Sequence, residues 1–357
     1  MANNGEQSRP VGQMLVSVAS GRTVTIDASK VATGSYFTTA NTWMNLPVRK
    51  FLETAFASNG SVLDPFAGDG HLLTLVAAEF GVATSGFDIQ GGRWPENDSL
   101  LTVPNPERAV IVTNPPYLAN HSAKRKGVHS LAAEYFESGR DNLYKVALDN
   151  CLAAADYVVA IIPETFLHSG YPTDRLVLAT VIEDALFADT DAPAVVACFG
   201  PETEAVLGQA AQVYLNESLV SSLSQLHELR LESQARSPRR RIQFNVAHGR
   251  VGLRAVDGTK AGERIRFMPG DEFDYSREAI KVSSRLMTYL ELPEVSDADL
   301  PKVIAEANAV LETLRVSSQD LVLAPFKGNN NNGRRRRRLD YEMARRLLVQ
   351  VLDAPKK

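Results

Sequence analysis

Residues 61–70 read Ser-Val-Leu-Asp-Pro-Phe-Ala-Gly-Asp-Gly, an apolar tripeptide that leads into a loop with two glycines. The tripeptide predicts a short buried strand, and the apolar spacing in residues 72–80 predicts a helix that Gly81 ends. A second strand is predicted at residues 83–88, where it ends in the acid Asp88. This order of strand, turn, helix and strand is typical of a parallel sheet, in which ligands bind beyond the carboxyl ends of the strands.

The same alternation continues along the chain to about residue 200. Apolar runs predict further strands at residues 109–113, 157–162 and 194–199, and helical spacing predicts helices at residues 46–58, 141–155 and 175–185. We therefore predict an α/β fold with a doubly wound, mostly parallel sheet. After residue 201 the alternation is lost, which predicts a mixed or largely helical region with a helix at residues 339–352.

Residues 114–117 read Asn-Pro-Pro-Tyr and follow a predicted strand directly. The two prolines remove two backbone donors and fix two φ angles, and they move Asn114 out of the helical region. The loop therefore offers two acceptors, the side-chain oxygen of Asn114 and the carbonyl of Pro115, beside the aromatic face of Tyr117. An amino group on a planar ring, which donates two hydrogens and stacks, fits such a loop.

Acidic side chains lie at or near the ends of two predicted strands. The glycines Gly68 and Gly70 permit a tight turn close to a ligand, but the loop lacks the dinucleotide fingerprint and the lysine of a phosphate loop. Asp64 suits a cationic group such as an α-ammonium, and Asp88 is placed to accept from ribose hydroxyls. Asp98 could accept from an adenine amine. Each acid also has a purely structural alternative. The loop that begins at Asp64 is alternatively a simple turn, Asp88 is alternatively a helix cap, and Asp98 is alternatively an ordinary turn residue.

The glycine loop followed by Asn-Pro-Pro-Tyr resembles the S-adenosylmethionine-dependent amino-methyltransferases of DNA, most closely the adenine-N6 group whose cofactor motifs precede the catalytic motif. The resemblance covers residues 36–200 and implies a Rossmann-like catalytic domain there, with residues 1–35 as an N-terminal extension and residues 201–357 as a target-recognition, DNA-binding region. It implies S-adenosylmethionine as the cofactor, bound by Phe37, Thr38, Asp64, Phe66, Ala67, Gly68, Gly70, Asp88, Ile89 and Asp98. It implies catalysis by Asn114, Pro115, Pro116 and Tyr117, with Tyr117 and Phe199 flanking a flipped adenine.

The net charge is −4, but the basic residues are concentrated in two segments. Residues 230–266 hold ten Arg and Lys against three Asp and Glu, and residues 327–346 hold eight against two. Two basic segments in an otherwise acidic chain indicate a polyanion-binding face, although solvated loops are the alternative. The predicted DNA contacts are Lys124, Arg125, Lys126, Arg239, Arg240, Arg241, Arg334, Arg335 and Arg336.

The composition also limits the partners that we expect. No apolar run approaches the ~20 residues that span a bilayer, and residues 1–10 lack the apolar core of a signal peptide. Cys151 and Cys198 lie in apolar runs without metal-ligand spacing, which predicts a cytoplasmic protein with no metal and no membrane partner. Double-stranded DNA is the expected partner, with a separate cognate restriction endonuclease as a further candidate.

Other acceptors for the methyl group stay open. The same amine chemistry serves an RNA base, the N4 amine of cytosine or a protein glutamine, although a large basic C-terminal region favours DNA. Methylation of a cytosine ring carbon is disfavoured because neither cysteine follows a proline in a loop. A catalytically inactive DNA-binding module is the alternative from another class, and the intact acids and Asn114 argue against it.

Overall fold

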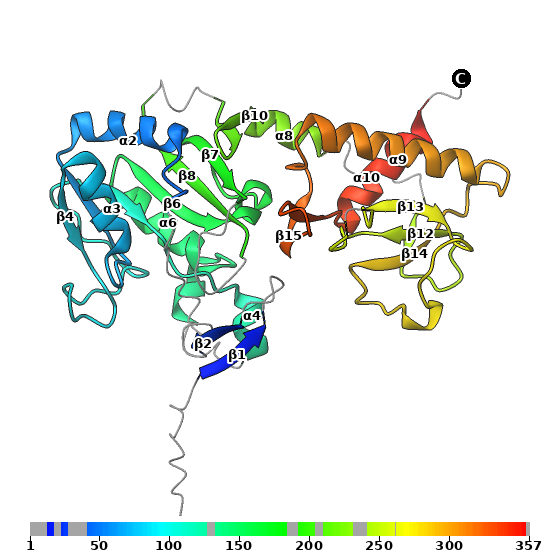
Figure 1. The fold of residues 1–357 in the computed structure, drawn as a ribbon, viewed down its shortest axis with the longest axis horizontal. Helices are drawn as coiled ribbons and strands as arrows, with labels where there is room; N and C mark the ends of the chain where they lie inside the picture. The colour runs from blue at the N-terminus through cyan, green and yellow to red at the C-terminus, as the bar shows by residue number, and fades with distance from the viewer. Residues whose placement is uncertain are drawn as a thin grey trace, which may run out of the picture. The chain divides into compact units, whose positions relative to one another are not determined.

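The structure, a computed structural model, describes residues 13–17, 23–27, 41–126, 133–183, 192–203, 210–230, 241–260 and 262–354. The chain forms two compact units (Figure 1). One unit comprises residues 1–163 and 171–209, and the other comprises residues 164–170 and 210–357. The N-terminal part of the first unit contains one antiparallel pair, β1 (Gln13–Ser17) and β2 (Thr23–Asp27).

The first unit is built on a mostly parallel sheet with the strand order β7-β8-β6-β5-β3-β4. The strands are β3 (Ser61–Asp64), β4 (Ala83–Gly86), β5 (Val110–Thr113), β6 (Val158–Pro163), β7 (Leu176–Ile182) and β8 (Ala194–Phe199). Strand β3 pairs in parallel with β4 and β5, and β5 pairs in parallel with β6. Strand β8 alone runs antiparallel, between β6 and β7. The predicted α/β fold with a mostly parallel sheet is therefore confirmed.

Helices cover these strands, and their ends follow local sequence signals. Among the described residues of this unit, the helices are α2 (Leu46–Ser58), α3 (His71–Phe80), α4 (Asn120–Lys126) and α6 (Leu143–Ala154), with the 3-10 helix η1 (Glu134–Ser138). Helix α2 packs on β7 and β8, α3 on β3, β4 and β5, and α6 on β6. The side chains of Asn45 and Asn142 cap α2 and α6 by accepting backbone N–H groups. Helix α3 lies between two glycines in the left-handed region, Gly70 and Gly81.

The helix predicted at residues 175–185 is wrong, because Leu176–Ile182 forms strand β7. This segment is almost entirely buried and is rich in β-branched residues. A strand buried on both faces lacks the apolar–polar alternation that distinguishes a strand from a helix, so the pattern was ambiguous. Arg175 fixes the start of β7 by donating to the backbone carbonyls of Leu152, Ala155, Asp156 and Gly200.

The second unit is mixed rather than largely helical. Its four-stranded antiparallel sheet has the order β11-β14-β12-β13. These strands are β11 (Gln243–Phe244), β12 (Val251–Arg254), β13 (Arg266–Pro269) and β14 (Met287–Glu291). Two antiparallel pairs join β9 (Gln212–Leu215) to β10 (Ser218–Ser222) and β15 (Ala324–Asn329) to β16 (Arg335–Arg338). The helices in its described part are η2 (Glu164–His168), α8 (Leu223–Leu229), η4 (Arg277–Ala279), α9 (Leu300–Ser317) and α10 (Tyr341–Asp353). The helix predicted at residues 339–352 is therefore confirmed.

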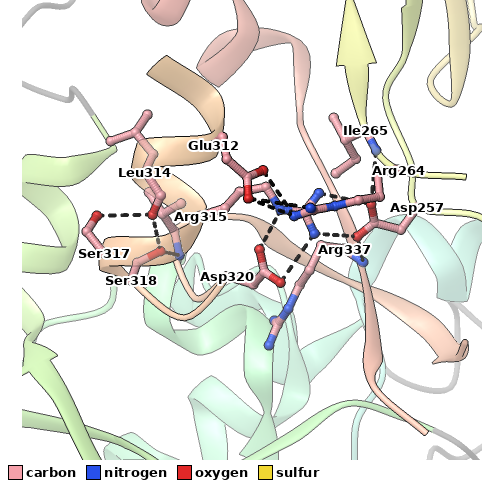
Figure 2. A network of polar contacts seen from close by, with 11 residues as sticks. Asp257, Arg264, Ile265, Glu312, Leu314, Arg315, Ser317, Ser318, Asp320 and Arg337 are labelled. Carbon is pink, nitrogen blue, oxygen red and sulfur yellow. Dashed lines mark hydrogen bonds and ion pairs between the residues drawn. The ribbon is translucent and has the colours of Figure 1, made fainter. Parts of the chain in front are cut away.

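A buried ionic network lies in the second unit (Figure 2). The carboxylate of Asp257 accepts two hydrogen bonds of 3.0 Å from the guanidinium of Arg315 and one of 3.0 Å from the backbone N–H of Ile265. It also accepts the backbone N–H of Arg337 at 3.2 Å. Arg315 donates in addition to Asp320, at 2.6 Å. The network therefore ties the end of α9 to the strand that carries Arg337.

A second buried ion pair joins the side chain of Arg337 to Glu164, and both side chains are almost wholly excluded from solvent.

None of the helices within the described ranges combines the length and the apolar character needed to cross a bilayer. In the same ranges, no cluster of three or more His, Cys, Asp or Glu side chains could hold a metal ion.

Candidate active site

Hydrogen bonds to the side chain of Asp88, just after β4, hold the glycine loop (residues 64–70) that lies between β3 and α3. The Oδ2 atom of Asp88 accepts the N–H of Gly68 at 3.1 Å, and its Oδ1 atom accepts the N–H of Gln90 at 2.8 Å. Gly68 and Gly70 have φ angles of 48° and 77°, a region that favours glycine. The loop therefore carries no side chain at Gly68 and Gly70, and the carboxylate of Asp88 holds its backbone in place.

Asp64 connects this loop to the strand that precedes the Asn-Pro-Pro-Tyr segment. It is buried, and its Oδ1 atom accepts the hydroxyl of Thr113 at 2.7 Å and the N–H of Phe66 at 3.0 Å. Burial raises the pKa of Asp64 to about 7, although these two hydrogen bonds act in the opposite direction. Because Thr113 directly precedes Asn114, this contact holds the two predicted loops side by side at adjacent strand ends.

Trp94 lies against the glycine loop, a contact that the sequence analysis missed. Its indole N–H donates to the carbonyl of Gly68 at 2.9 Å. A Cβ atom on Gly70 would lie 2.7 Å from the Trp94 ring, and one on Gly86 would lie 3.0 Å from it. Arg93 reinforces the arrangement, because it donates to the carbonyl of Asp69 at 2.8 Å and covers the indole ring at 4.9 Å. No local pattern in the sequence indicates where this indole folds.

The other predicted cofactor residues differ in their exposure. Asp98 is half-buried, accepts the hydroxyl of Tyr135 at 2.7 Å through Oδ2 and caps a turn by accepting the N–H of Leu100 at 3.1 Å. Ile89 leaves 57% of its surface exposed, directly after Asp88. Phe66 is half-buried and Ala67 is buried, whereas Phe37 and Thr38 lie outside the described residues.

The Asn-Pro-Pro-Tyr loop, residues 114–117, begins where β5 ends. The hydroxyl of Tyr117 shares its one hydrogen between two acceptors, the Oδ1 atom of Asn114 at 2.5 Å and the carbonyl of Ile161 at 2.6 Å. Asn114 and Tyr117 are half-buried, as is Pro116, and Pro115 is buried. Tyr117 therefore ties Asn114 to the neighbouring strand β6, and the amide of Asn114 is held at the carboxyl edge of the sheet.

Phe199 does not lie beside this loop, so its predicted contact with the target base is withdrawn. Strand β8 runs antiparallel, and Phe199 at its end pairs with Val158 and Leu176, the first residues of β6 and β7. It therefore lies at the amino edge of the parallel strands, opposite to Asn114, and its side chain is fully buried.

The predicted DNA contacts also divide. Lys124 and Arg125 are exposed on α4, just after the Asn-Pro-Pro-Tyr loop. Arg241 and Arg334 are exposed, and Arg336 is half-buried. Arg335 is only 7% exposed, which leaves its guanidinium out of reach of a phosphate, and its predicted contact is withdrawn. Arg239, Arg240 and the side chain of Lys126 lie outside the described residues.

Comparisons with known proteins add little to this geometry. No family model matches the chain, and no curated protein matches it. Several solved structures are similar. A Listeria monocytogenes protein provisionally assigned to the class I S-adenosylmethionine-dependent methyltransferases is 16% identical, covers 47% of this chain and 61% of its own, and has a TM-score of 0.34.

The methyltransferase subunit of a type I restriction-modification system from Streptococcus thermophilus is 15% identical, with coverages of 51% and 48% and a TM-score of 0.36. TrmN from Thermus thermophilus is 20% identical, with coverages of 43% and 47% and a TM-score of 0.27. The chain thus spans less than two thirds of each of these structures. Likenesses this low carry no argument about function, which has to come from the site itself.

Proposed function

We propose that this chain is an S-adenosylmethionine-dependent DNA methyltransferase that methylates the N6 amine of a flipped adenine. The observation that carries the proposal is the hydrogen bond between Asp64 and Thr113. It joins the glycine loop that would hold the cofactor to the strand that ends at Asn114. A methyl donor on the first loop and an amine on the second would meet at one edge of the sheet.

The residues of the site fit this cofactor. Gly68 and Gly70 allow the loop its tight turn at positive φ, and the carboxylate of Asp64 suits the α-ammonium of the methionine part. Asp88 and the exposed Ile89 follow the next strand, where they suit the ribose hydroxyls and one face of the adenine ring. When bound, the cofactor supplies the reactive methyl group, and the protein supplies position and charge.

The catalytic loop would hold the target amine. An adenine inside a duplex cannot present its amine to the cofactor, so it has to leave the base stack. The amide oxygen of Asn114 and the carbonyl of Pro115 are the acceptors that would receive the two amine hydrogens. Held in this way, the amine would turn its nitrogen lone pair toward the methyl group that a bound cofactor would supply. Stacking of the base on Tyr117 would contribute ~1–3 kcal/mol.

Sequencing that detects methylated bases tests this function directly. DNA from cells that express the chain should carry N6-methyladenine in one sequence context and lack it when Asn114 is changed. Methylation of cytosine N4, of RNA or of a protein glutamine in the absence of methylated adenine would assign the same amine chemistry to another acceptor. Binding of labelled cofactor separates an active enzyme from an inactive DNA-binding module.

Replacing Gly70 with Ala should weaken cofactor binding at least tenfold. The new Cβ would lie 2.7 Å from Trp94 and would occupy a backbone position with φ of 77°, so the loop has to shift. The matched control is Gly81→Ala at the other end of α3, which has a similar φ of 67° and nothing within 4 Å. Isothermal titration with S-adenosylmethionine should show a large loss for Gly70→Ala only. Equal losses in both variants would mean that general strain, rather than the loop, is responsible.

Cofactor affinity should rise as the pH is raised from about 5.5 to about 7.5. The pKa of Asp64 is about 7, so the carboxyl is mostly neutral at the lower pH and mostly charged at the higher one. Only the charged form attracts an ammonium group. Titrations across this range should show a pH-dependent affinity in the wild type and a weak, nearly constant affinity in Asp64→Asn. A wild-type affinity that does not change with pH would remove Asp64 from contact with the cofactor.

A further inference from the structure

The β15–β16 hairpin carries a concentration of positive charge. Residues 324–338 contain six Lys and Arg and no Asp or Glu. Successive side chains of a strand point to opposite faces, so the arginines of β16 alternate between buried and half-buried. Arg335 and Arg337 point inward, whereas Lys327 and Arg334 are exposed and form no ion pair with any residue that the structure describes. Arg336 is half-buried: its Nε atom donates to the carbonyl of Asp257 at 2.8 Å, and its guanidinium covers the ring of Phe326 at 4.9 Å.

The tip of the hairpin is held in one conformation. The side-chain oxygen of Asn330 accepts the N–H groups of Asn332 and Arg334, both at 3.0 Å, and its backbone carbonyl accepts the N–H of Gly333 at 2.9 Å. The backbone N–H of Asn331 donates to the carbonyl of Thr259 at 2.9 Å. These bonds fix the backbone of the tip before any ligand binds.

Two amide side chains project from this fixed tip. Asn331 and Asn332 are exposed, and their side chains make no hydrogen bond to another residue in the described ranges. Arg334 is exposed beside them. The tip therefore presents two amides and a guanidinium that can form hydrogen bonds with a partner.

The base of the hairpin is anchored to its own unit. The N–H of Leu339 donates to the carbonyl of Ala255 at 2.9 Å, and the N–H of Asp257 donates to the carbonyl of Arg337 at 3.0 Å. The side chain of Arg337 is paired with Glu164 in the interior. Because the hairpin is anchored at its base, the side chains at its tip are held in defined positions relative to the rest of the unit.

We propose that the β15–β16 hairpin enters the major groove of duplex DNA and reads base edges. The major groove admits a two-stranded ribbon, an Asn amide fits the edge of adenine, and an Arg guanidinium fits the edge of guanine. Asn331, Asn332 and Arg334 are the reading side chains, and the exposed Lys327 lies on the flank for a phosphate contact. This inference rests on the proposed function, because it names how that enzyme selects its sequence.

The test compares variants of the tip in the full-length chain. The double variant Asn331→Ala with Asn332→Ala and the single variant Arg334→Ala remove reading groups, and Lys302→Ala removes an exposed cation on α9 as the matched control. A preferred duplex is first selected by wild-type binding from a random-sequence pool. Affinities for this duplex and for a scrambled one are then measured, along with the sequence context of methylation in cells.

Discrimination between the two duplexes should fall roughly tenfold or more in both tip variants, and the methylated sequence should become less specific. Lys302→Ala should leave the discrimination unchanged. An equal loss of affinity for both duplexes would restrict the tip to phosphate contacts and overturn the inference. Unchanged discrimination would also overturn it, even if the wild type methylates adenine. Reduced discrimination in a protein that methylates no DNA would uphold the inference and reject the proposed function.

Discussion

Replacing Asn114 with Ala should lower methyl transfer at least 100-fold and leave cofactor affinity within a few fold. In the proposed mechanism the amide oxygen of Asn114 would be the acceptor that orients the target amine, and loss of one such preorganised group typically costs 10²–10³ in rate. The glycine loop at residues 64–70 would be untouched. Transfer of labelled methyl to DNA and titration of the cofactor measure the two effects separately.

Tyr117→Phe provides the comparison for this variant. It keeps the aromatic face but removes the hydroxyl that contacts Asn114 at 2.5 Å. A smaller loss of turnover is expected, because Asn114 remains present but is less firmly oriented. If Asn114→Ala keeps more than a few per cent of wild-type turnover, the catalytic role that we assign to the loop is wrong.

Replacing Asp257 with Ala should destabilise the second unit by about 3–5 kcal/mol, the usual result of removing one partner of a buried ion pair. The variant leaves the guanidinium of Arg315 and the backbone N–H groups of Ile265 and Arg337 without their acceptor in a buried site. Urea unfolding of the full chain, followed by circular dichroism, should show an earlier transition for this unit.

The control is Glu312→Ala, which removes an ion pair with Arg264 on the surface. Both side chains of that pair are about half exposed, at 52% and 49%, so the expected loss is below about 1 kcal/mol. The two acids lie in the same unit and both pair with arginine. The comparison of the two variants therefore tests how much the burial of the Asp257 network contributes to stability. Similar losses in both variants would contradict a special role for the buried network.

The fold of the first unit could largely be predicted because its signals are local. The apolar tripeptide before Asp64, the two glycines around α3 and the buried run before Asn114 each identify one element. The segment that became β7 could not be assigned in this way. Its apolar residues are buried on both faces, and only pairing with β8 decides between strand and helix.

The candidate site shows the same division between local and tertiary information. Asp64, Asp88 and Asn114 were placed at one sheet edge because parallel strands bring their carboxyl ends together. Phe199 was misplaced because the direction of its strand does not appear in the local sequence. The contact of Trp94 with the glycine loop depends on how residues 89–97 fold back, which periodicity does not describe.

The arginine run at residues 334–338 teaches a related lesson. Composition alone does not distinguish the five arginines from one another. In a strand, however, their side chains alternate between two faces, one buried and one more exposed. The turn signal was present in the sequence, because Asn-rich segments followed by glycine favour hairpin turns. Its low complexity concealed that signal, so no hairpin was predicted there and a solvated loop was the structural alternative.

The position of Trp94 allows its intrinsic fluorescence to report ligand binding at the glycine loop. The chain contains two tryptophans, and the other one, Trp43, is fully buried. Trp43 therefore contributes a nearly constant background emission, while the indole of Trp94 lies against the loop that would receive a cofactor. A molecule entering this loop would alter the emission spectrum of Trp94 without any attached dye. Candidate ligands can thus be screened by intrinsic fluorescence before the nucleic-acid substrate is known.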